Sequence, residues 1–372
     1  MHYTRIEIKK NTFINNICVT RNWISKFKPE VKYCLPVKAN AYGHGLIEIA
    51  RLAQNYVDYF GVACLDEGAK LRTSGIDKPI LVFGAFSELQ VGGLIQYNLE
   101  ITISSLYKAK LVSEFCEVRG LIAKVHIKID TGMNRVGVRV ESAKELIDFV
   151  CENKCFELVG IYSHLACGDL IDDEYTLMQI DLFSLCCNYA RKQAPNIICH
   201  LSNSAGVINY PGSLFDMVRP GIMSYGYSPS DGAFPAELSG IKPCLSLISE
   251  ITYFKVVKEN QGISYNHKYI TKGTTRVVTI PIGYGDGYKR ALSNIGEVII
   301  RGKKYTISGN ICMDMLMVDI GIDSVAYVGD EVILIGTQGD EEILLQDVAN
   351  KCNTISYEIL CGFNDRILRV FV

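Results

Sequence analysis

The stretch VKYCLPVKANAYGHGLIEIARLAQNYVDYFGVAC (31–64) contains two apolar runs separated by a longer amphipathic segment. The runs VKYCLPVKA (31–39) and YFGVAC (59–64) are short and almost continuously apolar, as strands buried on both faces are. The intervening HGLIEIARLAQNY (44–56) has its apolar residues at helical spacing. This order predicts two parallel strands joined by a crossover helix.

The same alternation continues through the first 230 residues. Six further runs resemble the first two: PILVFG (79–84), LEITIS (99–104), LIAKVHIKID (121–130), FELVGIYSH (156–164), NIICHLS (196–202) and FDMVRPGI (215–222). Helical patterns lie between them, and DEGAKLRTSG (66–75) ends in a glycine suited to a helix C-terminus. Eight such strands predict an α/β fold, a (β/α)₈ TIM barrel, over residues 1–235. An open doubly wound sheet is the alternative, although no G-x-G-x-x-G follows the first strand.

The rest of the chain has a different character. SPSDGAFPAELSGIKP (228–243) is rich in Ser, Gly and Pro, which is typical of a linker. Short strand patterns with turns follow: LSLISEITYFKVVKE, TTRVVTIPIG, GEVIIRGKKYTIS, MLMVDI and DEVILIG. ILLQDVANKCN (343–353) is the one good helical pattern there. We therefore expect a mostly β C-terminal domain over residues 236–372.

Composition excludes several classes of function. A net charge of −2 at pH 7 leaves no basic surplus for nucleic-acid binding, and no apolar run approaches the ~20 residues of a membrane span. The start MHYTRIEIKK carries charges where a signal peptide is apolar. The 14 cysteines are scattered without a C-x-x-C pair, which favours reduced thiols in a cytoplasmic protein. The cysteines and the 6 histidines also lack the spacing of a zinc site, so we expect no metal.

Polar and small residues follow several predicted strands, where a TIM barrel carries its active site. Lys38 ends the first strand, and loss of hydration there lowers the pKa of an amine and makes it a usable nucleophile. The hydroxyls of Ser202 and Ser204 follow the seventh strand, and backbone N–H groups near Gly221 follow the eighth, which together suit a phosphate. Alone, Lys38 could reach the rim and Ser204 could be a turn residue. Their combination indicates pyridoxal 5′-phosphate (PLP) as the cofactor.

These residues belong to longer strings that resemble those of alanine racemases. PVKANAYGHG (36–45) is the most specific and resembles the PLP-lysine signature of that family. Similar strings extend over nearly the whole chain: KIDTGMNRVGVR (128–139), SNSAG (202–206), VRPGIMSYG (218–226), SYN (264–266), PIGYGDGY (281–288) and GNICMD (309–314). The resemblance implies a PLP barrel followed by a β-domain, working as a head-to-tail homodimer. In that arrangement the partner's β-domain completes each active site.

The resemblance also implies roles for single residues. Lys38 would be the Schiff-base lysine and one catalytic base, and Tyr265 the second base, donated by the partner subunit. Two bases suit a racemase because a proton leaves one face of Cα and returns to the other, while PLP supplies the electron sink. Arg219 would face the pyridine nitrogen with His164 beside it. Arg135 would orient the tyrosine, the cofactor's phenolic oxygen and the substrate.

The remaining implied residues form two groups. The cofactor's phosphate would be held by Tyr42, Ser204, Gly221 and Ile222, and Asn203 would also bind the cofactor. Partner residues lining the substrate pocket and its entrance would include Met313, Asp314 and Tyr284. Lys128 matches a position that some members carbamylate, and a structural lysine in the barrel layer is the alternative.

The C-terminal tail SYEILCGFNDRILRVFV (356–372) departs from the family pattern. When Arg366 and Arg369 are aligned, Asp365 falls where most members have a tyrosine near the substrate entrance. Asn364 takes that position if the register slips by one. A shorter polar side chain leaves room for a hydroxyl group, which predicts activity on serine as well as alanine. An ion pair between Asp365 and a nearby arginine is the alternative.

Two asparagines also differ from common family residues. Asn310 stands where some members have an entrance arginine, so the usual gate cannot be assumed. Asn266 replaces the glycine that commonly follows the tyrosine base, which puts the turn geometry in question.

We therefore expect an isomerase, an alanine racemase that supplies D-alanine for peptidoglycan in a bacterial cytoplasm. A serine or dual alanine/serine racemase is the alternative, and a PLP-barrel decarboxylase or a PLP carrier is less well supported. Decarboxylases usually place an acidic residue, unlike Arg219, against the pyridine nitrogen. Carrier proteins stop after the barrel, whereas this chain continues for about 130 residues.

Overall fold

The structure is a computed structural model that describes residues 3–230 and 232–372. The chain divides into two compact units. The first, the barrel unit, consists of residues 14–41 and 46–242. The second, the β unit, contains the described residues up to 13, residues 42–45 and residues 243–372.

Parallel strands of the barrel unit close into a ring. Their order is β5-β4-β3-β2-β10-β9-β8-β6, and a further pairing of β5 with β6 completes the ring. The strands are β2 (Lys32–Pro36), β3 (Tyr59–Val62), β4 (Ile80–Val82), β5 (Glu100–Ile103), β6 (Ala123–Asp130), β8 (Phe156–Tyr162), β9 (Ile198–His200) and β10 (Met217–Val218), with β7 (Val138–Arg139) beside β6. Each of the eight predicted runs contains one of these strands, so the expected TIM barrel is confirmed.

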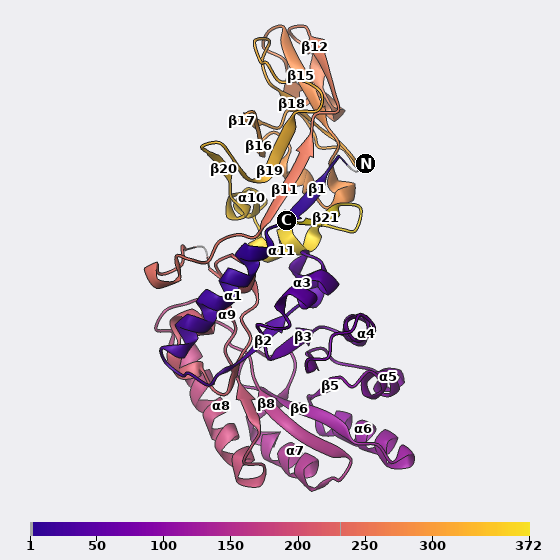
Figure 1. Ribbon diagram of the computed structural model, residues 1–372, viewed down its shortest axis with the longest axis vertical. Helices are drawn as coiled ribbons and strands as arrows, with labels where there is room; N and C mark the ends of the chain where they lie inside the picture. The colour runs from indigo at the N-terminus through magenta and orange to yellow at the C-terminus, as the bar shows by residue number, and fades with distance from the viewer. Residues whose placement is uncertain (1–2, 231) are drawn as a thin grey trace. The chain divides into compact units, whose positions relative to one another are not determined.

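Helices alternate with the strands and cover the outside of the ring (Figure 1). They are α1 (Lys10–Ser25), α3 (Leu46–Ala53), α4 (Leu65–Thr73), α5 (Val91–Gln96), α6 (Leu106–Arg119), α7 (Val140–Glu152), α8 (Glu174–Gln193) and α9 (Ser204–Asn209), whereas α2 (Lys38–Tyr42) is a short turn just after β2. Local signals set their ends: Ser105 caps α6, Asp173 caps α8, and Gly75 takes a φ of +83° just after α4, as predicted. Within the part of the chain that the structure describes, no helix has the length and apolar character of a membrane span.

The β unit contains strands in several sheets. The largest has the order β17-β16-β19-β11-β1-β21 with β20 beside β19, a second is β12-β15-β18, and β13 pairs with β14. The strands are β1 (Arg5–Ile8), β11 (Leu245–Glu250), β12 (Tyr253–Val257), β13 (Gly262–Ile263), β14 (Tyr269–Ile270), β15 (Thr275–Ile280), β16 (Glu297–Ile300), β17 (Lys303–Thr306), β18 (Leu316–Asp319), β19 (Glu331–Gln338), β20 (Glu341–Ile343) and β21 (Leu368–Phe371). The expected mostly β character is confirmed.

Several elements of the β unit were not predicted, including the short strands β1, β13, β14 and β20 and the helix α11 (Ser356–Gly362). β1 lies between β11, with which it is antiparallel, and β21, with which it is parallel. A strand of four residues carries little pattern of its own, and its partners lie at the far end of the chain. The expected helix at 343–353 is observed as α10 (Leu345–Lys351), but a second helix, α11 (Ser356–Gly362), follows it.

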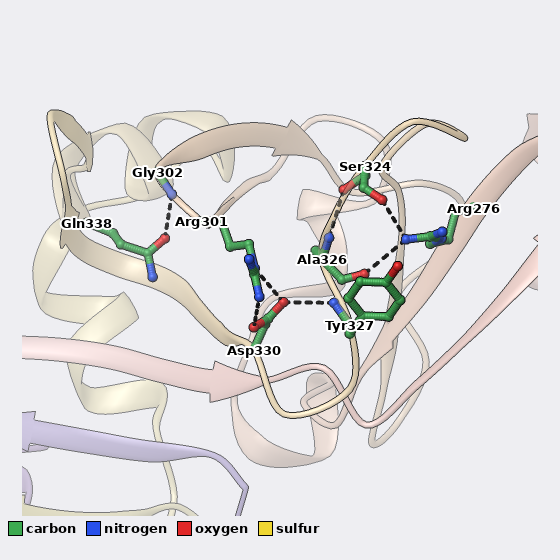
Figure 2. Close-up of polar contacts among 8 residues, drawn as sticks. All are labelled: Arg276, Arg301, Gly302, Ser324, Ala326, Tyr327, Asp330 and Gln338. Atoms are coloured by element: carbon green, nitrogen blue, oxygen red, sulfur yellow. Dashed lines mark hydrogen bonds and ion pairs between the residues drawn. The ribbon is translucent and has the colours of Figure 1, made fainter.

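Two arginines hold the loop between β18 and β19 (Figure 2). Arg301 donates through Nε and Nη2 to the carboxylate of Asp330 at 2.7 and 2.9 Å, and the same carboxylate accepts from Tyr327 N at 2.7 Å. Arg276 Nη1 donates to Ser324 O at 2.5 Å. Beside this loop lies a hollow of about 400 Å³, and none of the predicted site residues is among its lining residues.

Candidate active site

Lys38 follows β2 after a single residue and begins α2, which is a left-handed turn. Ala39, Asn40, Ala41 and Tyr42 have φ angles of 54°, 54°, 52° and 52°. Side chains other than glycine avoid this region, at about 1–2 kcal/mol per residue in a left-handed helix. A run of four such residues therefore needs fixed contacts to hold it.

Two side chains of the barrel unit supply those contacts. The carboxylate of Glu67, on α4, accepts from Ala39 N and from Ala63 N, both at 2.7 Å, and so ties the end of β2 to the end of β3. Asn40 Oδ1 accepts from Leu46 N at 2.8 Å, at the start of α3. Backbone strain of this kind concentrates at functional sites. Here the strained turn begins directly after the half-buried Lys38.

Arg219 lies directly after β10 and is buried, with only 4% of its surface exposed. Its Nη2 donates to Ser163 O at 2.6 Å and Leu201 O at 2.8 Å, and its Nη1 lies 2.7 Å from His200 Nδ1. These partners end the neighbouring strands β8 and β9. Burial lowers the pKa of Arg219 to about 10, which still leaves a cation at neutral pH. The guanidinium is thus held rigidly among three strand ends.

His164 is adjacent to this guanidinium. Its Nδ1 lies 3.5 Å from Arg219 Nη2, and its carbonyl accepts from Gln179 Nε2 at 3.1 Å. Desolvation, with the positive charges of Arg219 and Lys128, lowers the pKa of His164 well below its usual range. His164 is therefore neutral at physiological pH.

The predicted cations near β6 have different environments. Lys128 is buried within β6, with its Nζ 4.5 Å from the ring centre of Tyr162. Desolvation and the nearby charge of Arg219 lower its pKa to about 7. Arg135 is exposed in the following loop, where Asp130 Oδ1 accepts from Gly132 N and from Asn134 N at 3.0 Å.

The predicted phosphate residues of the barrel unit lie at the starts of two short helices. Asn203 caps α9, its Oδ1 accepting from Gly206 N at 2.9 Å. The buried Ser204 begins α9, and its Oγ lies 3.4 Å from Met223 N in the 3₁₀ helix Ile222–Tyr225. The first N–H groups of a helix have no partner within the helix and favour anions. Gly206 N and Met223 N already donate to the side chains of Asn203 and Ser204, so the donors for an anion would include the Ser204 hydroxyl and the N–H groups of Gly221 and Ile222.

Tyr42 groups with the β unit, as do the other predicted residues outside the barrel. It is buried, and its ring centre lies 6.1 Å from that of Tyr357. Gly43 follows with a φ of +78°, and a Cβ there would lie 2.1 Å from Leu360 O. Only glycine fits at this point of the signature.

Tyr265 begins a short 3₁₀ helix and is 67% exposed. Asn310 Nδ2 donates to Tyr265 O at 2.7 Å, while Ser264 Oγ donates to Asn310 O at 2.6 Å. The buried Asn310 therefore holds the tyrosine segment and is not an open gate. Asn266 takes φ +62° and ψ 12°, a conformation that asparagine tolerates better than most residues, so the turn does not require glycine.

Tyr284, Met313 and Asn364 lie on three adjoining segments. Tyr284 N donates to Cys312 O at 3.1 Å, and Gly285 N donates to Met313 O at 2.7 Å. Asn364 Nδ2 donates to Gly285 O at 2.7 Å. Tyr284 and Met313 are 44% and 58% exposed, and Asp314 beside them is also exposed.

Asp365 points elsewhere. Its side chain is 96% exposed, and its Oδ1 lies 3.8 Å from Arg369 Nη1. The ion pair that we considered as an alternative is therefore present. Asn364, one residue earlier, makes the contact to the Tyr284 segment instead.

The structure thus brings the predicted residues together in two groups. Lys38, His164, Ser204 and Arg219 lie at or just beyond the ends of the neighbouring strands β2, β8, β9 and β10. In the β unit, hydrogen bonds to backbone carbonyls link the segments that carry Tyr284, Met313 and Asn364. Asn310, in the segment that also carries Met313, links Tyr265 to this group.

Sequence reasoning missed a polar set inside the barrel. Glu100, His126 and His200 are buried on β5, β6 and β9. Glu100 contacts His126, His126 contacts His200, and His200 contacts Arg219. The signal was a charged or ionisable side chain within a run otherwise apolar enough to be buried on both faces.

The two units match the two domains of one known family. Residues 8–229 match the alanine racemase N-terminal domain, and residues 244–371 match the alanine racemase C-terminal domain. The chain is 36% identical over 372 residues to alanine racemase 2 of Caldanaerobacter subterraneus subsp. tengcongensis, covering 99% of this chain and 95% of that protein. It is 39% identical over 343 residues to alanine racemase of Halothermothrix orenii, covering 92% and 90%.

The fold agrees with these sequence matches. The solved structure of alanine racemase from Clostridium difficile 630 superposes with a TM-score of 0.91 at 36% identity, covering 100% of this chain and 96% of that one. Matches of this extent in both sequence and fold show that the chain belongs to the alanine racemase family.

Proposed function

We propose that this protein is a PLP-dependent alanine racemase that interconverts L- and D-alanine, with Lys38 and Tyr265 as its two bases. The observation that carries the proposal is the pairing of an amine and a buried guanidinium beyond the ends of adjacent strands. β2 leads to Lys38, and its neighbour β10 leads directly to Arg219. The relatives supply the substrate, since their names state that they are alanine racemases.

The donor groups of the barrel unit fit PLP. The amine of Lys38 suits the cofactor's aldehyde, and the fixed cation of Arg219 suits its pyridine nitrogen. Asn203, Ser204 and the N–H groups around Gly221 and Ile222, with Tyr42, would hold the phosphate, which accepts hydrogen bonds from N–H and O–H groups. When bound, PLP supplies a conjugated system that stabilises negative charge at the substrate Cα.

The chain's own residues then move the proton. Lys38 Nζ would take or return a proton on one face of Cα, and the phenolic oxygen of Tyr265 on the other. Either direction of the reaction uses both groups, so the substrate inverts. Arg219 stays cationic because its pKa of about 10 lies above neutral pH. It would therefore donate a hydrogen bond to the pyridine nitrogen without releasing a proton, which would favour return of the proton to Cα.

Tyr265 would act in a partner's site, which implies a homodimer. Three large side chains of the connected β-unit group, Tyr265, Met313 and Tyr284, are 67%, 58% and 44% exposed. Grouped exposed side chains of this kind mark protein–protein contacts. We propose that a second copy of the chain covers this surface, and that Asp314 and Asn364 border the substrate entrance there.

The alternatives have less support. The relatives' names do not favour a serine racemase, and the ion pair between Asp365 and Arg369 accounts for the residue on which that prediction rested. The buried Arg219 argues against a decarboxylase, and the matched C-terminal domain argues against a carrier protein. The cytoplasmic location and the supply of D-alanine for peptidoglycan stay predictions.

The deciding experiment measures kcat/KM for L-alanine and for L-serine with PLP-reconstituted protein, by following chirality directly. We expect alanine to be favoured on the order of a hundredfold, because a site shaped for a methyl group rejects an added hydroxyl only moderately. Comparable values would restore the serine alternative. Activity on neither amino acid would overturn the racemase proposal.

A further inference from the structure

Four buried side chains form a continuous chain of contacts inside the barrel. Glu100 Oε2 lies 2.7 Å from His126 Nε2, and His126 Nδ1 lies 3.0 Å from His200 Nε2. His200 Nδ1 lies 2.7 Å from Arg219 Nη1. The exposed fractions are 5%, 0%, 0% and 4% from Glu100 to Arg219, so the whole chain of contacts is shielded from water.

The chemistry of the two ends determines where every proton lies. A guanidinium can only donate, so His200 Nδ1 must accept from Arg219. The proton of a neutral His200 then lies on Nε2 and is donated to His126 Nδ1. His126 in turn carries its proton on Nε2 and donates it to Glu100 Oε2. The opposite arrangement would leave His200 without a proton on either nitrogen, or require a neutral arginine.

We infer that Glu100, His126 and His200 are positioning residues that hold Arg219 in place through one defined set of histidine tautomers. In this arrangement both imidazoles are neutral with the proton on Nε2. Glu100 supplies the negative charge that balances the buried guanidinium across two neutral rings. Neither buried charge is then isolated, which is the condition under which buried charges are tolerated.

The surroundings of His200 support the neutral form. Burial, with the nearby charge of Arg219, lowers the pKa of His200 well below its usual range. The ring of Tyr162 stacks on His200 with an interplanar angle of 3° and a centroid distance of 4.8 Å. Thr102 Oγ1 donates to Val82 O at 2.6 Å, so the Tyr162 hydroxyl donates to Thr102 at 2.7 Å. This stack fixes the plane in which His200 meets Arg219.

The inference deepens the proposed function, and its link to catalysis rests on that function. The four-residue arrangement itself does not, because it is formed entirely by side chains of the barrel unit. A measurement on cofactor-free protein therefore tests the arrangement even if the racemase proposal fails.

The first test is ¹⁵N NMR of histidine-labelled protein, cofactor-free and PLP-reconstituted. We expect His126 and His200 each to show a neutral ring with its proton on Nε2 in both forms. A cationic ring, or a proton on Nδ1 of either residue, would overturn the inference. Because this test uses the wild-type chain, it does not depend on whether a variant folds.

The second test compares two substitutions of Glu100. Glu100→Gln keeps an oxygen that accepts from His126, whereas Glu100→Leu removes the acceptor. We expect the Gln variant to retain both tautomers and the Leu variant to lose the single Nε2–H form. Thr20→Val is the control, because Thr20 is also buried in the barrel unit and its hydroxyl donates to Asn16 O, away from the four residues and from Tyr162.

The link to function is read in the same variants. With PLP labelled with ¹⁵N in its ring, the pyridine signal should shift less in Glu100→Gln, which loses the charge but keeps the acceptor, than in Glu100→Leu, which loses both. The kcat for alanine should fall on the order of tenfold to a hundredfold in the Leu variant and much less in the Gln variant. Equal losses in Gln, Leu and the Thr20→Val control would reduce Glu100 to a general packing residue and overturn the inference.

Discussion

The residues around Arg219 and those around Tyr265 are built in opposite ways. Arg219 is 4% exposed, and its side chain has hydrogen-bond partners from two neighbouring strand ends. Tyr265 is 67% exposed, and the contacts described for its segment, through Ser264 and Asn310, hold its backbone. One group is fixed within a single unit, while the other presents its side chain outward.

This difference indicates how the two halves of the proposed site are assembled. A buried cation needs its partners before any ligand arrives, because leaving it unpaired in a dry interior is costly. An exposed phenol on a held backbone gains its environment only when another surface covers it. A substitution among the barrel residues should therefore affect the site of the same chain. A substitution among the exposed β-unit residues should affect the site of the partner chain.

The largest effect should come from Lys38→Ala. We expect racemisation to fall more than about ten-thousandfold, because both the attachment point and one base are lost. The visible absorbance that PLP gains on bonding to lysine should disappear. Lys32→Ala, at the exposed start of the same strand, is the control and should retain both. Persistence of the absorbance in the Lys38 variant would remove Lys38 from its role.

Tyr265→Phe should have the next largest effect on activity. Loss of the hydroxyl alone should reduce kcat by about a hundredfold to ten-thousandfold while PLP binding remains. Tyr253→Phe, at a tyrosine that is 55% exposed on the same unit, should have no such effect. Unchanged turnover in Tyr265→Phe would contradict the two-base assignment.

Mixing the Lys38→Ala and Tyr265→Phe proteins tests the association directly. About one quarter of wild-type activity should return, because half of randomly mixed dimers are hybrids and each hybrid holds one intact site. No recovery under proven subunit exchange would mean that the site is not shared.

Lys128→Met tests the buried group through stability. The pKa of Lys128 is about 7 in the folded chain and 10.5 ordinarily, so the unfolded chain binds more protons between these values. Stability should therefore rise with pH across this window, by up to about 1.4 kcal/mol per pH unit from this group. Denaturant unfolding between pH 7 and pH 10 should give a smaller slope in the Met variant. Equal slopes would show that Lys128 is charged in the fold.

Asn310→Ala should have a moderate effect. Loss of the hydrogen bond to Tyr265 O should reduce stability by about 1 kcal/mol and kcat on the order of tenfold. Asn15→Ala is a matched control, because Asn15 Nδ2 also donates to one carbonyl, that of Gly240 in the barrel unit. It should leave kcat unchanged. A kcat loss no larger in Asn310→Ala than in this control would limit Asn310 to stability.

Asp365→Asn should have the smallest effect. The carboxylate is 96% exposed and its ion pair with Arg369 spans 3.8 Å, a geometry that contributes about 0–1 kcal/mol. The ratio of kcat/KM for alanine and serine should stay within about twofold of the wild type, as expected for a solvated surface charge. A larger change would return Asp365 to the substrate entrance, and Asn364→Ala would then be the informative comparison.

Much of the fold could be predicted because the barrel strands carry their own signal. Within runs such as LIAKVHIKID (121–130), the strand interior at residues 125–129 is buried on both faces, so the run is mostly apolar and differs from the amphipathic helices. β1 and α11 could not be predicted in this way. They are short, and pairing with β11 and β21 gives β1 a stability that its four residues do not show alone.

The candidate site divides in the same manner. Lys38, Ser204 and Arg219 could be proposed from their places after predicted strands, because the strand ends of a barrel meet at one rim. The contacts of Glu100 with His126 and of His126 with His200 could not, since they join residues 26 and 74 positions apart. Nothing in the local sequence tells which histidine meets which partner.

By itself, the sequence determined the barrel, the β-rich second half and the family resemblance, because strand patterns and motif strings are local properties. Only the tertiary structure decided that Asn364, and not Asp365, contacts the Tyr284 segment, that Asn266 accepts the turn, and that a carboxylate balances Arg219 through two histidines. These outcomes depend on which groups meet across the fold and on how much water remains between them. The direction of a hydrogen bond and the burial of a charge depend on the neighbouring groups, and those neighbours come from distant parts of the chain.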